Sequence, residues 1–367
     1  MKITSAEIYA SPVRLKAPFI TSLGPMQYAE NVIVVLRTSS GLSGFGECNP
    51  FKTILGETIE TCMATGRLLA EALLGKDPLQ PPACSELMDR IIYGNTAIKS
   101  AFDIALHDIA SAHAGLPLYK YLESESTSRV LQTDYTISLS DPEKMAMDAK
   151  EILANGFKII KVKLGDAKRD VERIRGIREV AGDLPVRIDA NQGWPLEEAE
   201  RILQELEPFN IQYCEEPIAR WDFTSLPMLK RSSPIPIMSD ESCFDHHDAK
   251  RLINTKSCDL INMKLAKSSG FVKGMKIAQL AREAGMQVQV GGFLESRLGF
   301  TASAHLAIAN TNAAYCDFDT PLMQEEDFVT GGINYDDGGF VRMPPSNGLG
   351  ATVDERFLSR MKGYIVS

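Results

Sequence analysis

Charged side chains recur at regular intervals through the second half of the sequence, each at or just past the end of a short apolar run. The set comprises Lys161, Lys163, Asp189, Glu215, Asp240, Lys264, Glu295, Asp317 and Asp319. From Lys163 to Lys264 the gaps are 26, 26, 25 and 24 residues. This spacing matches one strand plus one helix, and the carboxyl ends of parallel barrel strands converge on one mouth. We therefore expect these side chains to share a site.

Three of these residues are carboxylates on three neighbouring predicted strands, namely Asp189, Glu215 and Asp240. A ligand set made only of oxygen atoms favours Mg²⁺, with Mn²⁺ as the alternative, over Zn²⁺. Glu215 is followed by Glu216, and Asp240 is followed by Glu241. Spacing alone therefore leaves open which member of each pair binds the metal.

The lysines suit proton transfer. Lys161 and Lys163 are two residues apart in an apolar strand, so both point to the same face. Neighbouring, partly buried ammonium groups should have lowered pKa values, and such a lysine can act as a general base near neutral pH. Lys264 lies beyond the carboxylates in strand order. Two lysines flanking a divalent cation suit removal of a proton α to a carboxylate, with return to the opposite face of the enediolate.

The elements that would position these residues follow a strand–helix rhythm that begins near residue 130. We expect strands at 131–139, 157–164, 185–190, 211–214, 235–238, 259–265, 286–290 and 314–318. About eight such units over about 190 residues fit a closed barrel better than an open doubly wound sheet. No Gly-x-Gly-x-x-Gly motif follows a first strand, which also disfavours the open sheet.

The chain divides into three parts by pattern. Residues 1–125 contain predicted strands and then helices, which indicates an α+β domain. Residues 126–320 form the predicted barrel. Residues 321–367 are rich in Gly, Pro and Asp, and we expect this tail to return to the first domain and complete its sheet.

Composition excludes several functional classes. The 367 residues carry a net charge of −9, which disfavours a nucleic-acid partner. No apolar run approaches the roughly 20 residues of a membrane span, so we expect no membrane partner. The seven cysteines contain no Cys-x-x-Cys pair, and the N-terminal residues lack an apolar leader. We expect a cytoplasmic protein with reduced thiols that forms a homo-oligomer.

Five strings in the sequence resemble the muconate-lactonizing-enzyme subgroup of the enolase superfamily. They are Lys161-Val162-Lys163, Asp189-Ala190-Asn191-Gln192-Gly193-Trp194, Glu215-Glu216-Pro217, Ser239-Asp240-Glu241-Ser242 and Asn262-Met263-Lys264-Leu265. The resemblance covers essentially the whole chain. It implies an α/β fold, a modified (β/α)₇β TIM-like barrel with an α+β capping domain built from the N-terminal region and the C-terminal tail.

The same resemblance implies roles for the site residues. Asp189, Glu215 and Asp240 would hold one Mg²⁺ per subunit. Lys163 and Lys264 would be the acid/base pair, and Lys161 a helper that faces the substrate carboxylate. Lysine bases with Mg²⁺-stabilised enediolates are the general pattern of this superfamily.

The reaction varies within the subgroup, so the lysines and the metal do not decide it. Asp317 and Asp319 place two carboxylates on one face at the barrel mouth, which suits an ammonium group. This pair resembles the dipeptide epimerases, in which it holds the free α-ammonium of the substrate; a turn-forming or helix-capping pair is the alternative. Thr136 resembles another substrate contact of these enzymes. Phe293 and Glu295 lie where the loop after the seventh strand would meet the substrate.

The loop at 18–25 bears on the second residue of the dipeptide. Relatives that act on Ala-Glu carry an arginine there, and this sequence has Gly24 with the apolar Phe19, Ile20 and Leu23 nearby. An acidic side chain would lack a partner. We predict a small-molecule dipeptide substrate, Ala-Xaa with a small or hydrophobic Xaa, epimerised by 1,1-proton transfer. The alternatives are an N-acylamino acid racemase, an o-succinylbenzoate synthase or cycloisomerase, and an L-Ala-D/L-Glu epimerase.

Overall fold

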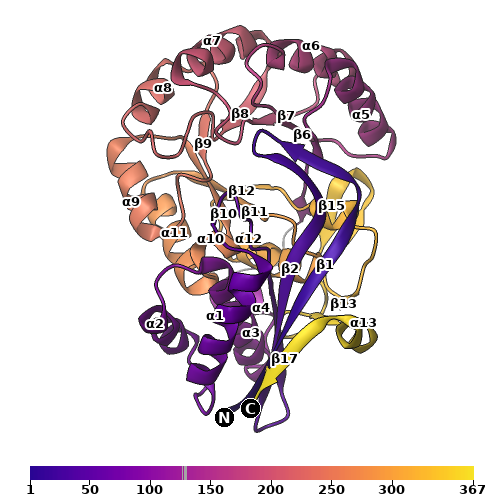
Figure 1. The fold of residues 1–367 in the computed structure, drawn as a ribbon. Coiled ribbons are helices and arrows are strands. Elements are labelled where there is room, and N and C mark those ends of the chain that lie inside the picture. Colours follow the sequence, from indigo (N-terminus) through magenta and orange to yellow (C-terminus); the bar gives the residue numbers. More distant parts are fainter. Residues whose placement is uncertain (126, 128–129) are drawn as a thin grey trace.

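A four-stranded antiparallel sheet forms the centre of the N-terminal domain. The computed structural model describes residues 1–125, 127 and 130–367 (Figure 1). The sheet order is β17-β1-β2-β3, with β1 at Ile3–Thr21, β2 at Gly24–Thr38, β3 at Ser43–Cys48 and β17 at Lys362–Val366. The central strand β2 contains a β-branched run, Val32–Val35, that is fully buried. The first and last strands of the chain therefore share one sheet.

Four helices accompany this sheet: α1 (Ile59–Leu73), α2 (Pro81–Ile91), α3 (Thr96–His113) and α4 (Leu118–Leu122). The long helix α3 packs directly on β3. Gly46 permits this approach, because a Cβ there would lie 1.9 Å from the Ala101 carbonyl oxygen. We call residues 1–125 together with β17 the capping domain; the residue boundaries of the three parts of the chain stay predictions.

The second half of the chain contains an eight-stranded parallel barrel. Its strands are β5 (Tyr135–Ile137), β6 (Ile160–Lys163), β7 (Val186–Asp189), β8 (Ile211–Glu215), β9 (Ile237–Ser239), β10 (Leu260–Lys264), β11 (Gln287–Gly291) and β12 (Ala313–Cys316). They pair in sequence order, and a parallel bridge between Thr133 and Cys316 joins the two ends. The expected barrel with its capping domain is confirmed.

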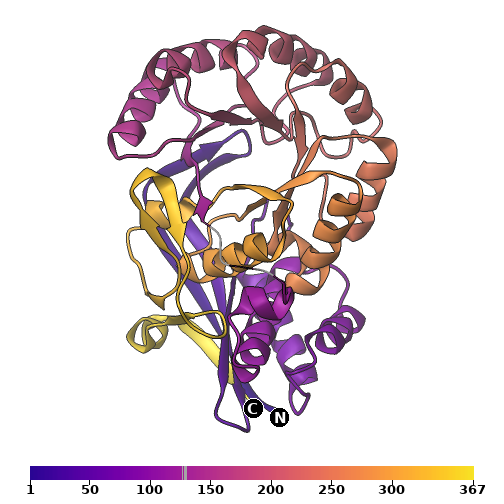
Figure 2. The same ribbon diagram turned by 180° about the vertical axis from the view of Figure 1, so that it is seen from behind.

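Helices surround the strands on the outside, as Figures 1 and 2 show. They are α5 (Pro142–Ala154), α6 (Asp170–Ala181), α7 (Leu196–Leu206), α8 (Leu226–Ser232), α9 (His246–Thr255), α10 (Leu265–Ser268), α11 (Phe271–Glu283) and α12 (Arg297–Ala309). The short 3₁₀ helix η1 (Glu207–Phe209) extends α7. None of the described helices has the length and apolar character needed to cross a membrane.

The tail does more than the sequence suggested. Its last strand β17 pairs with β1 at residues 6–10, as expected. The hairpin of β14 (Asn334–Asp336) and β15 (Phe340–Arg342), however, pairs with β4 (Leu131–Gln132) beside the barrel (Figure 2). The remaining elements are η2 (Thr320–Met323), β13 (Val329–Gly331), η3 (Asp337–Gly339), β16 (Ala351–Val353) and α13 (Glu355–Arg360).

One expected strand is divided in two. The run at 131–139 forms β4 and β5, because residues 133 and 134 leave the ladder to hydrogen-bond elsewhere. Thr133 N–H bonds the Gly339 carbonyl, and the Thr133 hydroxyl accepts the Phe318 N–H. The break lets the first barrel strand meet both the tail and the last barrel strand.

Candidate active site

The strand register places the predicted residues side by side. Lys163 is opposite Asp189, and Asp189 is opposite Glu215. Asp240 directly follows β9, and Lys264 ends β10. The three acids, which we call the central trio, are fully buried. All five side chains therefore lie at the carboxyl ends of their strands, where the sequence spacing predicted them.

Each predicted lysine touches an acid of the central trio. Lys163 Nζ lies 2.6 Å from Asp189 Oδ2, and Lys264 Nζ lies 2.7 Å from Asp240 Oδ2. Lys161 Nζ is 2.7 Å from Glu215 Oε2 and 3.3 Å from Asp189 Oδ2. Without a metal, the lysines thus neutralise the proposed ligands.

This arrangement corrects one expectation about the lysines. Burial by itself lowers the pKa of Lys161 and of Lys264. The surrounding carboxylates outweigh burial, chiefly Asp317 and Glu215 at Lys161 and Asp240 at Lys264, and raise both pKa values above the ordinary range. The expected lowering is therefore wrong for Lys161, because Asp317 Oδ2 and Glu215 Oε2 each lie 2.7 Å from its Nζ.

A further lysine was missed in the sequence. Lys267 is buried in α10, and its Nζ donates to Asp240 Oδ1 at 2.6 Å, to the Asp240 carbonyl at 2.5 Å and to the Asn262 carbonyl at 2.9 Å. All three of its protons are used, so the side chain is fixed. The spacing of three residues from Lys264 was visible, but nothing in the sequence predicted a helical turn that begins at Leu265.

The second acid of each adjacent pair binds protein groups. Glu216 Oε2 accepts the Asp240 N–H at 2.7 Å and the Ser242 N–H at 3.2 Å. Glu241 Oε1 accepts from Asn191 Nδ2 at 3.2 Å. Glu216 therefore supports the loop that carries Asp240.

The central trio fits a hard divalent cation. Its donors are all carboxylate oxygens, and burial together with the charge of Asp189 raises the pKa of Glu215 to about 7. Mutual repulsion of this kind is what a bound cation relieves. Among the described residues, Asn262 Oδ1 is also buried without a hydrogen-bond partner, while Asn262 Nδ2 donates to Glu215 Oε1 at 2.7 Å.

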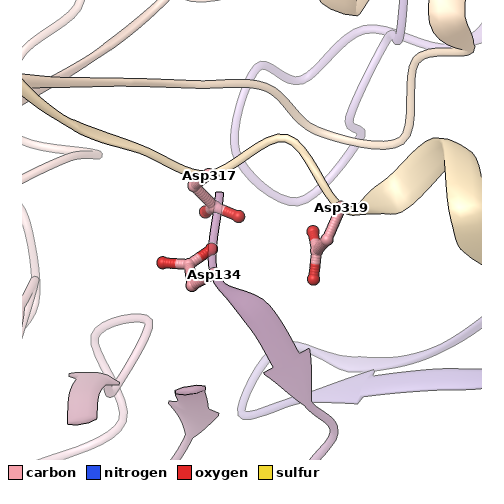
Figure 3. Close-up of side chains that lie close together, drawn as sticks. All are labelled: Asp134, Asp317 and Asp319. Atoms are coloured by element: carbon pink, nitrogen blue, oxygen red, sulfur yellow. The ribbon is translucent and has the colours of Figure 1, made fainter. Parts of the chain in front are cut away.

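A second acidic group lies where the barrel closes. Asp134, Asp317 and Asp319, which we call the closing trio, bring carboxylate oxygens within 4.8 Å of one another (Figure 3). Asp317 Oδ2 is 2.7 Å from Lys161 Nζ, and Asp134 Oδ2 is 2.7 Å from an Arg187 nitrogen. Among the described residues, Asp134 Oδ1 and Asp319 Oδ1 are buried without a hydrogen-bond partner. Asp134 and Arg187 were not among the residues predicted from the sequence, although Asp134 directly precedes β5 and lies two residues before Thr136.

The capping alternative for Asp319 does not hold. Asp319 directly precedes η2, at the N-cap position, but its side chain makes no hydrogen bond to that helix. Its Oδ2 accepts the Thr136 N–H at 2.5 Å instead. The carboxylate thus points into the barrel, toward the end of β5.

One small cavity collects several of the predicted residues. Its polar lining includes Thr136, Lys163, Lys264 and Asp317. Its apolar lining comprises Phe19, Leu23, Phe51, Ile54, Phe293 and Leu294. Lys161, Asp319 and Glu295 lie outside this lining. The loop side of the cavity thus combines residues of the capping domain with residues of the barrel.

Glu295 is placed differently from the expectation of a substrate contact. It is buried, and its Oε2 accepts the Phe293 N–H at 2.6 Å. It therefore holds the loop after β11 in shape. Phe293 itself lines the cavity, as expected.

An aromatic ring faces each of the two lysines that line the cavity. The Phe19 ring centre is 5.7 Å from Lys163 Nζ, and the Phe293 ring centre is 4.6 Å from Lys264 Nζ. Phe19 lies in β1, near the turn that joins β1 to β2. That turn is fastened to the barrel mouth, because Ser22 Oγ donates to the Asn191 carbonyl at 2.7 Å.

Known proteins share both the sequence and the structure. Residues 3–122 match the mandelate racemase/muconate lactonizing enzyme N-terminal domain, and residues 144–357 match the enolase C-terminal domain-like family. The D-Ala-D/L-Ala epimerase of Cytophaga hutchinsonii is 53% identical over 100% of both chains. The L-Ala-D/L-Glu epimerase of Bacillus subtilis is 38% identical over 95% of this chain and 96% of that protein.

Solved structures agree with these matches. The dipeptide epimerase of Cytophaga hutchinsonii complexed with Mg and D-Ala-L-Val superimposes with a TM-score of 0.99 at 52% identity and covers 100% of both chains. The dipeptide epimerase of Enterococcus faecalis complexed with Mg and L-Leu-L-Tyr gives a TM-score of 0.93 at 35% identity, over 96% of this chain and 100% of that one. This chain belongs to the mandelate racemase/muconate lactonizing enzyme family of the enolase superfamily.

Proposed function

We propose that this protein is a Mg²⁺-dependent dipeptide epimerase that inverts the α-carbon of the C-terminal residue of Ala-Xaa dipeptides with a small or hydrophobic Xaa. One observation carries the proposal: Lys163, Lys264 and Asp317 line a single cavity with an apolar wall. Two bases and an anion for an ammonium group are the groups that this reaction requires. The epimerases named above, two of them with Mg and a bound dipeptide, support the assignment.

The two lysines are placed for transfer between opposite faces of a carbon atom. They end β6 and β10, which are four strands apart in a ring of eight and so lie across the barrel from each other. One lysine takes the α-proton, and the other delivers a proton to the opposite face.

Asp189, Glu215 and Asp240 would hold the Mg²⁺. Bound there, Mg²⁺ polarises the substrate carboxylate and acidifies the neighbouring C–H bond. Lys163 contacts Asp189 and Lys264 contacts Asp240, so both bases would lie beside the metal ligands. Lys161 keeps its contact with Asp317 and helps to receive the substrate carboxylate.

Asp317 and Asp319 would hold the α-ammonium of the dipeptide. A primary ammonium group offers three donors, and the oxygens of both residues lie at one end of the barrel mouth. Muconate and succinylbenzoate are anions without an ammonium group, so these carboxylates would repel them. This argument favours a dipeptide over the substrates of the other subgroup members.

The wall of the cavity favours an apolar Xaa. An adjoining cavity of about 160 Å³ shares Leu23, Phe51 and Leu294 with the first and includes Gly24. A larger Xaa side chain could extend into it. The position that carries an arginine in Ala-Glu relatives is thus a glycine beside apolar groups, so an acidic Xaa lacks that partner; the lysine that lines the adjoining cavity is Lys52.

Proton exchange at the α-carbon tests the proposal. The protein with Mg²⁺ is incubated in D₂O with mixed Ala-Xaa dipeptides, containing either L-Ala or D-Ala, and mass and NMR spectra are followed. We expect deuterium only in the C-terminal residue of some dipeptides, and none in the presence of EDTA. No deuterium in any dipeptide would refute the proposal and direct attention to N-acylamino acids.

We also propose a cytoplasmic homo-oligomer. All seven cysteines are buried, which suits a reducing compartment. Trp221 and Phe223 are 75% and 55% exposed in the loop after β8, and this apolar surface suits contact with a second copy. Light scattering coupled to size-exclusion chromatography tests the oligomer, and a monomer at micromolar concentration would refute it.

A further inference from the structure

A buried glutamate of the capping domain holds the barrel loop that faces Lys264. Glu47 lies in β3 and is 1% exposed. Its Oε2 accepts the Ser296 hydroxyl at 2.7 Å and the Gly299 N–H at 2.8 Å, and the Ser296 N–H lies 3.1 Å from both oxygens. These donors surround the N-terminus of α12, so a side chain from one domain caps a helix of the other.

The same glutamate is tied to a second point on the loop. Asn31 Nδ2 donates to Glu47 Oε1 at 2.9 Å and to the Leu294 carbonyl at 3.0 Å. Asn31 is fully buried in β2, and Asn49 Nδ2 donates to its Oδ1 at 2.6 Å. Buried hydrogen bonds from the sheet of the capping domain thus hold residues 294–299 in place.

The loop in turn fixes the aromatic ring at Lys264. Phe293 stacks on Phe51 of the capping domain, with ring centres 4.9 Å apart. Its other neighbour is Lys264 Nζ, 4.6 Å from the ring centre. A displacement of this loop therefore moves the surface against which the Lys264 ammonium rests.

The lysine on the other side is held independently. Phe19 faces Lys163, and its strand is attached through Ile20, whose carbonyl accepts the Leu139 N–H at 2.9 Å. The Ser22 hydroxyl donates to the Asn191 carbonyl and so attaches the adjacent turn to the barrel. None of these contacts involves Glu47 or Asn31, so the two lysines have separate supports from the same domain.

We propose that Glu47 is a positioning residue for one half of the reaction: it sets the loop that orients Lys264, while Lys163 is oriented without it. The inference rests on the proposed epimerase function. It predicts an asymmetric defect, because proton transfer on only one face of the carbon should suffer when Glu47 is altered.

The variant Glu47→Gln tests this asymmetry. Glutamine keeps the shape but turns an NH₂ group toward N–H or O–H donors, whichever way the amide is oriented, and so loosens the loop. In D₂O, the holoenzyme is given each epimer separately, and deuterium in recovered substrate is compared with inversion. The epimer whose α-proton Lys163 removes should still exchange that proton for deuterium but rarely invert, because delivery of a proton by Lys264 is impaired.

The expected size is a fall in epimerisation on the order of tenfold to a hundredfold, as for a catalytic group displaced by about 1 Å. The ratio of exchange to inversion should rise for the same epimer that keeps exchanging in Lys264→Ala, and for that epimer alone. A ratio that stays at the wild-type value for both epimers would overturn the proposal.

Glu57→Gln is the matched control. Glu57 is also a buried glutamate of the capping domain that accepts at a helix N-terminus, from Ala97 N–H at 3.0 Å, but its other partners, Thr96 and Cys62, belong to the same domain. The Glu57→Gln variant should have a lower free energy of unfolding but an unchanged ratio of exchange to inversion. If Glu47→Gln does not fold, Asn31→Ala takes its place under the same criteria.

A crystal structure separates this proposal from the proposed function. If the wild-type protein exchanges no dipeptide proton, the proposed function fails. The position of Phe293 in Glu47→Gln still decides the positioning role: a ring displaced from Lys264 supports it, and an unmoved ring overturns it.

Discussion

The barrel mouth holds two groups of three carboxylates that differ in the cations facing them. The central trio meets four lysines, namely Lys161, Lys163, Lys264 and Lys267. The closing trio meets two cations, Lys161 and Arg187, and leaves buried oxygens without partners. The three carboxylates of the central trio are therefore contacted by more cations than there are acids, whereas those of the closing trio are contacted by fewer.

The pKa values follow the contacts of each acid and differ within each trio: burial and the charge of Asp189 raise the pKa of Glu215 to about 7, whereas Lys161 outweighs burial and lowers the pKa of Asp317 to about 2. Burial opposes ionisation in both trios, but Lys264 and Lys267 hold the pKa of Asp240 well below its usual range. Burial and the charge of Asp317 raise the pKa of Asp319 to about 7. The central trio can accept a divalent cation only by giving up lysine contacts, which frees bases. The closing trio can accept a single positive charge without displacing anything.

The largest expected effect comes from the lysines that the central trio would release. Lys163→Ala and Lys264→Ala should each lower epimerisation on the order of 10³-fold, because a positioned base contributes about this much. Each variant should still exchange the α-proton of one epimer, and the two variants should retain opposite epimers. NMR in D₂O measures both rates. Retention of the same epimer by both variants would contradict opposed bases.

Metal affinity should separate the two trios. Asp240→Asn removes a charge from the central trio and should weaken Mg²⁺ binding at least on the order of a hundredfold, measured by titration calorimetry. Asp319→Asn should leave Mg²⁺ binding within about twofold, since it touches only the closing trio. The reverse pattern would make the closing trio the metal site, a role that its oxygen spacing permits.

Substrate affinity should separate them in the opposite sense. Asp319→Asn should raise KM for free dipeptides on the order of tenfold to a hundredfold, because a charge-assisted hydrogen bond contributes about 1.5–3 kcal/mol. Exchange of an N-acetylated dipeptide, already slow, should not change further. An equal loss for both substrates in steady-state kinetics would remove the ammonium role.

The smallest expected effect concerns the apolar part of the cavity wall, to which Leu23 belongs. Leu23→Arg places a cation between the two adjoining cavities and should improve the ratio of Ala-Glu to Ala-Val turnover by about fivefold, as a partly exposed ion pair contributes up to about 1 kcal/mol. Leu23→Gln is the uncharged control of similar size. A shift of equal size with glutamine would mean that polarity, not charge, is responsible.

Regular spacing made the strand ends predictable, because each strand–helix unit returns the chain to the same mouth. The expected strand at 185–190 is Val186–Asp189, and the one at 211–214 is Ile211–Glu215. The ion pairs were not predictable, since Lys161 contacts Asp189, Glu215 and Asp317, which come from three other strand ends. These contacts depend on how side chains reach across a closed barrel, which no sequence distance expresses.

The contacts between domains were also beyond the sequence. Glu47 and Ser296 are separated by most of the chain, and neither lies in a recognisable motif. The tail illustrates the same limit: its composition suggested a return to the first domain, but the pairing of β15 with β4 depends on where the barrel strand breaks. The local sequence pattern therefore predicted where the site residues lie along the strands. Their contact partners depend on how the elements pack in the folded chain.

The pairing of β17 with β1 has a consequence for synthesis. Among the described elements, β17 is the last to leave the ribosome, so the edge of β1 at residues 6–10 stays without its neighbour until residues 362–366 have been made. The barrel strands, which pair in order, can assemble earlier. Strand β1 carries Phe19 and leads to the turn that is fastened over the barrel mouth. A ribosome-bound chain would therefore form its barrel before the capping domain covers the mouth. Stalled chains would expose an unpaired strand edge, a feature that favours aggregation and attracts chaperones.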